Sequence, residues 1–449
     1  MKETDYLIIG AGAMGIAFAD ELFTSNSKVK LTIVDRRAKA GGHWNDAYPF
    51  VRLHQPAAFY GVNSLVLGNG TTDLSSKSEI LGYYEKVMTK FKNSGRVEFL
   101  SQHNYLGNGK VADLQNPDNS ITYTINKRLV DATYMKVEVP STHAPKYEVE
   151  KEVPLIPLNE LVEQHDKWEK FYIIGNGKTG MDAVLYLLSK GVAEDNIYWI
   201  CPNQAWLFSR EDLQVGNVAK VVLEQVDILR TTKNVDEFFL AMEKSAGISR
   251  LDKNTLPKKW RCATVSPSEL EQLRQIKNLI QKGRVTGITK SEIALQQGSI
   301  SYTGRALFVD CSANALSREK KMDIFSDGKI TLQPVLFCQQ VFSAAVIARM
   351  ELTNISDPKR NQLVPIPHPE VKEDWPAALS LSIENLLLLH RHFPMWMFRA
   401  RLNFMSHETL FNYFYYSVKA ILLSPGASKR ARELDEMVAI LFLLTIFYH

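Results

Sequence analysis

Two glycine-rich turns carry the residue types most suited to chemistry in this sequence. In each turn the first glycine lets the chain bend sharply out of a strand, and the second leaves room for a pyrophosphate. The third lets the next helix pack closely, and the start of that helix offers free N–H groups to phosphate oxygens. The sequence therefore predicts two dinucleotide sites. Their predicted contacts are Gly10, Gly12, Met14 and Gly15 in GAGAMG, and Gly175, Gly177, Lys178, Thr179 and Gly180 in GNGKTG.

The elements around both turns follow one plan. A short apolar run precedes each turn (6–9 and 171–174), and apolar residues at helical spacing follow it (16–23 and 181–188). A second apolar run comes next in both cases (29–34 and 196–201). Strand, glycine turn, helix and strand in this order form a βαβ unit. The sequence thus predicts the same unit twice, with the two turns 165 residues apart.

The residues after the second strand differ between the two units. In the first, Asp35 ends the strand, where a carboxylate can accept hydrogen bonds from ribose hydroxyls, and Arg36 beside it is a further predicted cofactor contact. In the second, the positions from Cys201 to Gln204 hold neither an acid nor a base. A ribose diol favours a carboxylate and a 2′-phosphate favours an arginine. The choice between NADPH and NADH therefore stays open, as does nicotinamide binding itself.

The segment after the first unit, RRAKAGGHWNDAYPFVRLHQPAAFYGVNS (36–64), resembles a known family. GGHW is similar to the GGxW segment of flavin-containing monooxygenases, and YPFVRLH is similar to the same region in the plant flavin monooxygenases of auxin biosynthesis. GNGKTG also resembles the turn that receives NADPH in this family. The resemblance implies that the first unit holds FAD. It places Gly42, His43 and Trp44 along the pyrophosphate and flavin, and Arg52 near the isoalloxazine ring.

Five other positions are candidates for roles near the flavin or for FAD contacts. His54, Gln55 and Asn63 follow the flavin-proximal strand, so they are the predicted catalytic residues; His54 could equally be a packing histidine. Asp310 ends a predicted strand and is a candidate FAD contact, with a plain turn residue as the alternative. Gln333 precedes a predicted helix, and the resemblance places such a helix start at the flavin's pyrimidine edge.

The predicted fold class is α/β, with two Rossmann-like dinucleotide-binding domains of the glutathione-reductase-like FAD/NAD(P) type. A discontinuous FAD-binding domain (1–165 and 305–373) would hold an inserted NAD(P)-binding domain (166–304), followed by a helical C-terminal region (374–449). The resemblance implies an FAD-dependent oxidoreductase that uses NADPH or NADH and oxygen to oxidise a small organic substrate. Two alternatives remain: a flavin reductase or oxidase without stable oxygen transfer, and a flavin-binding regulatory protein with a degenerate nicotinamide site.

Composition restricts the remaining possibilities. The net charge is only +4 and no Lys/Arg block occurs, which argues against nucleic-acid binding. The ten histidines lack metal-ligand spacing, so no metal site is predicted. An apolar strand begins close to Met1, so we expect no signal peptide and a cytoplasmic protein. Aromatic patches after residue 394 could line a substrate tunnel, pack a homodimer or fill a helical core. The apolar tail 438–448 could make peripheral contact with a membrane.

Overall fold

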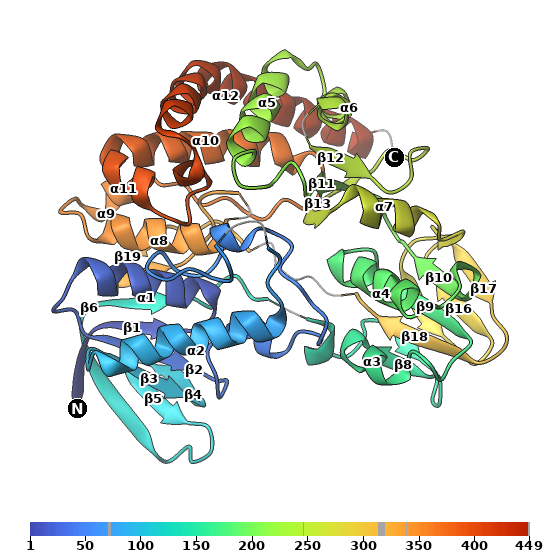
Figure 1. Cartoon of the computed structure of the whole chain (residues 1–449), viewed down its shortest axis with the longest axis horizontal. Helices are drawn as coiled ribbons and strands as arrows, with labels where there is room; N and C mark the ends of the chain where they lie inside the picture. Colours follow the sequence, from blue (N-terminus) through green and yellow to red (C-terminus); the bar gives the residue numbers. More distant parts are fainter. Residues whose placement is uncertain (71–72, 138, 246, 313–318, 338, 448–449) are drawn as a thin grey trace.

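The computed structural model describes residues 1–447 apart from 71–72, 138, 246, 313–318 and 338. Figure 1 shows three parts of the molecule. One sheet with its helices lies on the left, a second lies on the right, and a helical layer lies above them.

The first sheet is formed mainly by parallel strands around β1. The order is β19-β20-β6-β1-β2-β3, and only β19 in this series runs antiparallel to its neighbour. Helix α1 follows the first glycine turn and packs against α8. This arrangement confirms the predicted first βαβ unit. The bounds are β1 (Lys2–Ile9), α1 (Ala13–Ser25), β2 (Leu31–Asp35), α2 (Lys77–Asn93), β3 (Val97–Ser101), β4 (His103–Gly107), β5 (Lys110–Asp113), β6 (Ser120–Asp131), β19 (Phe325–Ser326), β20 (Lys329–Thr331) and α8 (Gln340–Glu351).

The second sheet is wholly parallel, in the order β14-β10-β9-β18-β8. It confirms the second βαβ unit, in which the glycine turn joins β9 to α4. A small antiparallel sheet of β15, β16 and β17, with β7 parallel at its edge, adjoins it. The bounds are β7 (Glu148–Val149), β8 (Leu155–Pro157), α3 (Leu161–Gln164), β9 (Lys170–Ile174), α4 (Lys178–Ser189), β10 (Ile197–Ile200), β14 (Asn278–Ile280), β15 (Val285–Ile288), β16 (Glu292–Leu295), β17 (Gly298–Ser301) and β18 (Ala306–Asp310).

Two segments lie outside the parts that the sequence assigns to them. Strand β18 is expected in the FAD-binding domain, but it pairs with β9 along its whole length and so belongs to the second sheet. Strand β8 also joins this sheet, although it precedes residue 166. Apolar β18 fits the core of either sheet, and only its pairing partner decides between them.

The middle of the expected NAD(P)-binding domain packs with the C-terminal helices. A small sheet of β11, β12 and β13 carries Trp206 and Trp260, and Trp260 lies 4.6 Å from Trp375 on α10 between ring centroids. Helix α5 packs against α12 (Figure 1). The helical layer is thus built from two distant segments. Its helices and the adjoining small sheet are β11 (Ala205–Ser209), α5 (Val218–Thr231), α6 (Val235–Ser245), β12 (Ile248–Arg250), β13 (Lys259–Val265), α10 (Asp374–His392), α11 (Pro394–Arg399) and α12 (Leu410–Phe447). Helix α7 (Pro267–Arg274), which follows β13, packs against α4 of the second unit.

Helix α12 ends the described chain and contains Pro425. In the part of the chain that the structure describes, no helix combines the length and apolar character needed to cross a bilayer. Within the apolar tail 438–448, side chains from residue 439 onward lie outside the described part.

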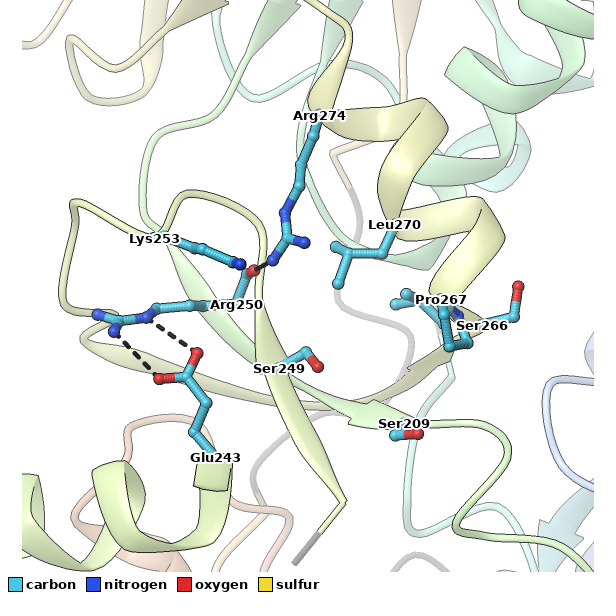
Figure 2. A pocket seen from close by; sticks show the side chains of 10 residues that line it. Ser209, Glu243, Ser249, Arg250, Lys253, Ser266, Pro267, Leu270 and Arg274 are labelled. Atoms are coloured by element: carbon cyan, nitrogen blue, oxygen red, sulfur yellow. Dashed lines mark hydrogen bonds and ion pairs between the residues drawn. The ribbon is translucent and has the colours of Figure 1, made fainter. Parts of the chain in front are cut away.

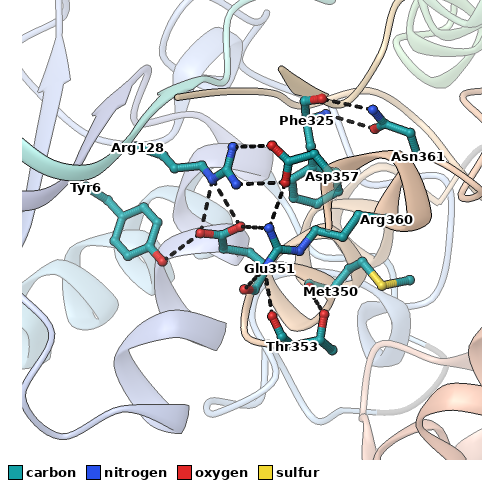
Figure 3. Close-up of polar contacts among 9 residues, drawn as sticks. All are labelled: Tyr6, Arg128, Phe325, Met350, Glu351, Thr353, Asp357, Arg360 and Asn361. Atoms are coloured by element: carbon teal, nitrogen blue, oxygen red, sulfur yellow. Dashed lines mark hydrogen bonds and ion pairs between the residues drawn. The ribbon is translucent and has the colours of Figure 1, made fainter. Parts of the chain in front are cut away.

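A nearly buried ion network fastens the first sheet to the end of α8 (Figure 3). Arg128 on β6 pairs with Glu351 at 3.3 Å and with Asp357 on α9 (Asp357–Arg360) at 2.8 Å. Tyr6 on β1 donates its hydroxyl hydrogen to Glu351 at 3.0 Å. Arg360 also pairs with both carboxylates. Because buried charges need partners, this network fixes how α8 lies on the sheet.

Candidate functional site

The first glycine turn opens at the carboxyl end of β1. Gly10 has a φ of +104°, which glycine adopts without strain, and its N–H donates to Val34 O at 2.7 Å. A Cβ on Gly15 would lie 2.0 Å from Gly10 O, so no side chain fits there. Gly12 is the N-cap of α1 and, having no side chain, leaves the first N–H groups of the helix uncapped. Met14, another predicted contact, is partly buried against the core.

The Gly41–Gly42 pair lies directly against this turn. The N–H of Gly41 donates to Ala11 O at 2.8 Å. A Cβ on Gly42 would lie 2.9 Å from Gly12 Cα, and Gly42 has a φ of +57°. The two segments therefore meet backbone to backbone, and a side chain at Gly42 would force them apart.

Asp35 fixes the shape of the turn from the end of β2. Its Oδ2 accepts the Ala11 N–H and its Oδ1 accepts the Arg37 N–H, both at 2.7 Å. The carboxylate is buried, and its remaining lone pairs are those that ribose hydroxyls would use. The side chain of Arg36, predicted as a contact, is exposed.

Aromatic rings follow the glycine pair. Trp44 donates its indole N–H to Tyr60 OH at 2.6 Å, and both rings are buried. His43 stacks on Trp44 with 5.5 Å between ring centroids. Burial, with a smaller contribution from Arg37, lowers the pKa of His43 to about 4, so the ring is neutral at pH 7. Together these rings form an apolar wall next to the turn.

The second glycine turn repeats the geometry of the first. Gly175 donates its N–H to Ile200 O at 3.1 Å, and a Cβ on Gly180 would lie 2.0 Å from Gly175 O. No atom of the described chain lies within 4 Å of where a Cβ on Gly177 would stand. The backbone at Gly177 is therefore open to close approach by a ligand. Thr179, in the first turn of α4, is partly buried.

Tyr48 links the two units through Asp182, the residue that Lys178 also pairs with. Lys178 forms an ion pair with Asp182 one turn further along α4. Tyr48, which follows the GGHW segment, donates its hydroxyl hydrogen to the other oxygen of Asp182 at 2.5 Å. The first unit thus touches the helix that opens at the second turn.

His54 lies where the two units meet. Its carbonyl oxygen accepts a hydrogen bond from the Thr264 hydroxyl at the end of β13. Burial lowers the pKa of His54 to about 3, and the positive charges of Lys178 and Arg210 act in the same direction. The imidazole is therefore neutral at pH 7, with one nitrogen as donor and the other as acceptor. Gln55 next to it donates to Phe59 O at 3.4 Å.

Arg210 is held beside this junction by an acid. Its Nη2 lies 2.7 Å from Glu269 Oε2 and donates to Thr264 O at 3.2 Å. Burial opposes ionisation of Glu269, but hydrogen bonds from Arg210 and Ser266 outweigh it and hold the carboxyl pKa below its usual value. The charge of Arg210 is therefore already paired with that of Glu269.

The structure does not bring Asn63 and Arg52 to this junction. Asn63 donates to Glu21 on α1 and accepts the Leu402 N–H, each at 3.1 Å. Both of its amide groups are used to join α1 to the C-terminal region, so the catalytic prediction for Asn63 is replaced by a structural one. Arg52 is exposed and donates to Leu74 O at 3.0 Å, which fastens a surface segment.

The two late candidates occupy different sheets. Asp310 ends β18 in the second sheet, so its prediction as a contact in the FAD domain is corrected. Its Oδ1 accepts the Ser312 N–H at 2.9 Å, as Asp131 at the end of β6 accepts the Thr133 N–H at 3.0 Å. Asp310 is thus the counterpart of Asp131. Gln333 does follow the first sheet, but its amide is paired with both backbone groups of Met322.

The sequence did not connect Tyr48 or Glu269 with this junction. Tyr48 and Asp182 are 134 residues apart, and no spacing rule connects them. Glu269 had a visible signal, because Ser266-Pro-Ser-Glu269 is a capping box, which the structure confirms. The pairing of Glu269 with Arg210, by contrast, has no signal in the sequence.

A surface pocket of about 490 Å³ lies between α6, β12 and α7 (Figure 2). Its lining comes from the small sheet of β11, β12 and β13 and from these helices, and includes no residue of either glycine turn. Arg250 is paired with Glu243 at 3.0 Å, and Arg274 donates to the carbonyl oxygens of Leu251 and Arg250. Its two arginines are thus used by the protein, and we assign the pocket no ligand.

Several known proteins and solved structures are similar to this chain. No family model matches the chain. The uncharacterized protein Rv2000 of Mycobacterium tuberculosis is 38% identical over 423 residues, which covers 90% of this chain and 78% of that protein. The probable FAD-binding monooxygenase AlmA of an Acinetobacter species is 32% identical over 99 residues, 22% of this chain and 20% of AlmA.

Among solved structures, a polycyclic ketone monooxygenase from the fungus Thermothelomyces thermophila has a TM-score of 0.54 at 11% identity. The match covers 98% of this chain and 88% of that one. At this identity the similarity concerns the fold.

Proposed function

We propose that this chain, which belongs to the family of mycobacterial Rv2000, is an FAD-dependent oxidoreductase of the flavin-monooxygenase-like type. In this proposal FAD binds at the first glycine turn and a nicotinamide nucleotide binds at the second. The substrate class is a small organic molecule that is oxidised with oxygen.

The observation that carries the proposal is the backbone contact between Gly12 and Gly42. A pyrophosphate needs N–H donors and space where a Cβ would otherwise stand. The uncapped start of α1 supplies the donors, and the lack of a side chain on Gly42 lets its segment lie directly against the turn beside them. Asp35 stands at the end of the next strand, where a ribose would lie. The residues present therefore fit FAD.

Bound FAD would supply the redox chemistry, taking hydride from the nicotinamide and delivering electrons to oxygen. The chain's own residues would position the reactants and keep water out. Trp44 and Tyr60 form the buried wall beside the turn. His54, neutral and held by Thr264, could donate or accept a hydrogen bond at the junction without adding charge.

We further propose that the nicotinamide nucleotide is NADH rather than NADPH. Gly10 bonds to Val34 O and Gly175 bonds to Ile200 O, so the residues that follow, Asp35 and Cys201, are counterparts. Cys201 is buried, and burial raises the pKa of its thiol, so it is uncharged. This position therefore offers a 2′-phosphate no cation.

The two cations at the junction, Lys178 and Arg210, already have acidic partners. Lys178 is paired with Asp182 and Arg210 with Glu269. Gln204, beyond Cys201, is buried, and within the described part of the chain neither of its amide atoms has a hydrogen-bond partner. An amide can bond a ribose hydroxyl, whereas a phosphate dianion buried against it would be left unneutralised.

Anaerobic reduction of the purified protein tests both proposals. We expect a bound-flavin spectrum that bleaches with NADH and much more slowly with NADPH, followed by recovery when oxygen returns. Stoichiometric peroxide release on recovery, with no product from any organic substrate, would favour the reductase or oxidase alternative. A yellow protein that neither nucleotide reduces would favour a flavin-binding regulatory protein. A protein that does not bind added FAD would overturn the proposed function.

A further inference from the structure

The first half of α12 exposes a continuous apolar face. The spacing of its large side chains is helical, so they lie on adjacent turns of one side of the helix. Phe411 is 78% exposed, Phe414 61% and Leu422 71%. We call this set the apolar stripe; it consists of Leu410, Phe411, Phe414, Tyr415, Val418, Ile421 and Leu422.

The opposite side of the same helix accounts for its attachment to the protein. Tyr413 and Leu423 are buried there, and Tyr413 OH is 2.8 Å from His390 Nε2 on α10. Farther along, Ala427, Ala431 and Leu434 continue the buried side. The apolar stripe is therefore not needed to dock α12, because a separate face does so.

The second half of α12 shows that an exposed face on this helix is normally polar. Between residues 425 and 436 its outward positions include Lys429, Arg432 and Glu436. The change from apolar to charged occurs on one continuous helix. Scattered exposed apolar residues need no explanation, but a contiguous set of this kind marks a contact surface.

Cations lie near the apolar stripe, and the acid next to its first residue, Glu408, is half-buried and accepts a hydrogen bond from Asn412. Arg391 and Arg399, on α10 and α11, are exposed, and Phe398 between them packs on Tyr413 at 5.1 Å. Lys419 lies within the stripe's own segment, where the sequence from 409 to 432 holds no Asp or Glu. An apolar face with a cationic border is the pattern of a helix that lies in a membrane interface.

We propose that the apolar stripe docks the protein onto the surface of a membrane that contains anionic lipids. Phe411, Phe414 and Leu422 insert among the acyl chains, and Arg391, Arg399 and Lys419 contact the headgroups. A second copy of the chain fits less well, because a two-fold dimer places the same patch against itself. Arg391, Arg399 and Lys419 would then lie close to their own copies, and the neighbouring acid, Glu408, is already bonded to Asn412.

Vesicle co-sedimentation of the full chain tests this proposal. We expect binding to vesicles of phosphatidylcholine mixed with phosphatidylglycerol, weaker binding to phosphatidylcholine alone, and a decrease at high salt. The double variant F411S/F414S should lose binding by about tenfold or more, because it removes two inserting rings. The matched control K429S/R432S changes the exposed side of the second half and should keep most of the binding. Unchanged thermal midpoints in both variants would show that the fold is intact.

Two results would overturn the proposal. One is a wild-type chain that does not bind either kind of vesicle. The other is a wild-type dimer in light scattering that F411S/F414S converts to a monomer, which would assign the apolar stripe to a second copy.

Discussion

Gly12 and Gly42 face each other with so little space that a Cβ on Gly42 would stand 2.9 Å from Gly12 Cα. About thirty residues of chain separate them, and two different glycine motifs bring them together. Their contact joins the GAGAMG turn and the GGHW segment into one proposed binding site for FAD.

Replacing Gly42 by Ala should weaken FAD binding by about tenfold or more, because the methyl group separates the two segments. Gly95→Ala is the matched control. Gly95 also has a left-handed φ of +69°, but no atom of the described chain lies within 4 Å of where its Cβ would stand. Both variants carry the backbone cost of about 1 kcal/mol, so their difference reports the contact. Equal FAD dissociation constants for the two variants, measured by fluorescence titration, would contradict the assignment.

Gly177→Val should leave the flavin content and thermal midpoint nearly unchanged, because the space around Gly177 is open. Flavin reduction by NADH should slow strongly, since the new side chain occupies the space proposed for the pyrophosphate. Gly180→Ala is a contrasting variant: its methyl group would meet Gly175 O at 2.0 Å, so we expect destabilisation. Stopped-flow absorbance at the flavin band and thermal melts distinguish these outcomes. Normal reduction in Gly177→Val would remove the nucleotide from this turn.

Asn203→Arg should improve use of NADPH relative to NADH. The residue follows β10 in the neutral loop, and its side chain is partly exposed, so an arginine there can reach a 2′-phosphate. Binding of NADP⁺ and NAD⁺, followed by calorimetry, reports the change without relying on turnover. Asn203→Gln is the uncharged control and should leave the ratio unaltered. A wild-type chain that already binds NADP⁺ more tightly would refute the charge argument.

His54 should make the protein less stable in acid. An unfolded histidine takes up a proton near its ordinary pKa of 6.5, whereas folded His54 resists protonation until about pH 3. Between these values the unfolded state binds more protons, so stability falls as the pH falls, by up to about 1.4 kcal/mol per pH unit. From about pH 7.5 to about pH 5.0, His54→Gln should therefore lose about 2 kcal/mol less than the wild type in urea unfolding. His392→Gln, at an exposed site, should follow the wild type. Parallel pH profiles for all three proteins would show that His54 is not held neutral.

Arg128→Ala should lower the free energy of unfolding by about 3–5 kcal/mol, because Glu351 would lose one of its two cationic partners while remaining buried. Lys110→Ala, which removes an exposed lysine from the hairpin beside β6, should change it by less than about 0.5 kcal/mol. Chemical unfolding followed by circular dichroism provides the comparison. A loss below about 1 kcal/mol for Arg128→Ala would show that the network is dispensable.

The sequence determined the parts of the protein that depend on local pattern. A glycine turn between an apolar strand and an apolar helix is defined within about twenty residues, and both such units appear where they were predicted. The positions of Gly10, Gly15, Gly175 and Gly180 follow from sterics that act within one turn. The helical character of the chain after Asp374 was likewise legible from its residues.

Only the tertiary structure decided what depends on partners distant in the chain. An apolar strand such as β18 fits either sheet, and pairing with β9 placed Asp310 in the second one. An amide such as Asn63 can serve catalysis or structure, and its bonds to Glu21 and Leu402 decided for structure. Whether an apolar side chain of α12 is buried or exposed depends on which face meets α5 and α10. Local patterns set the conformation of the backbone over a few residues, whereas burial and pairing arise only when separate elements pack together.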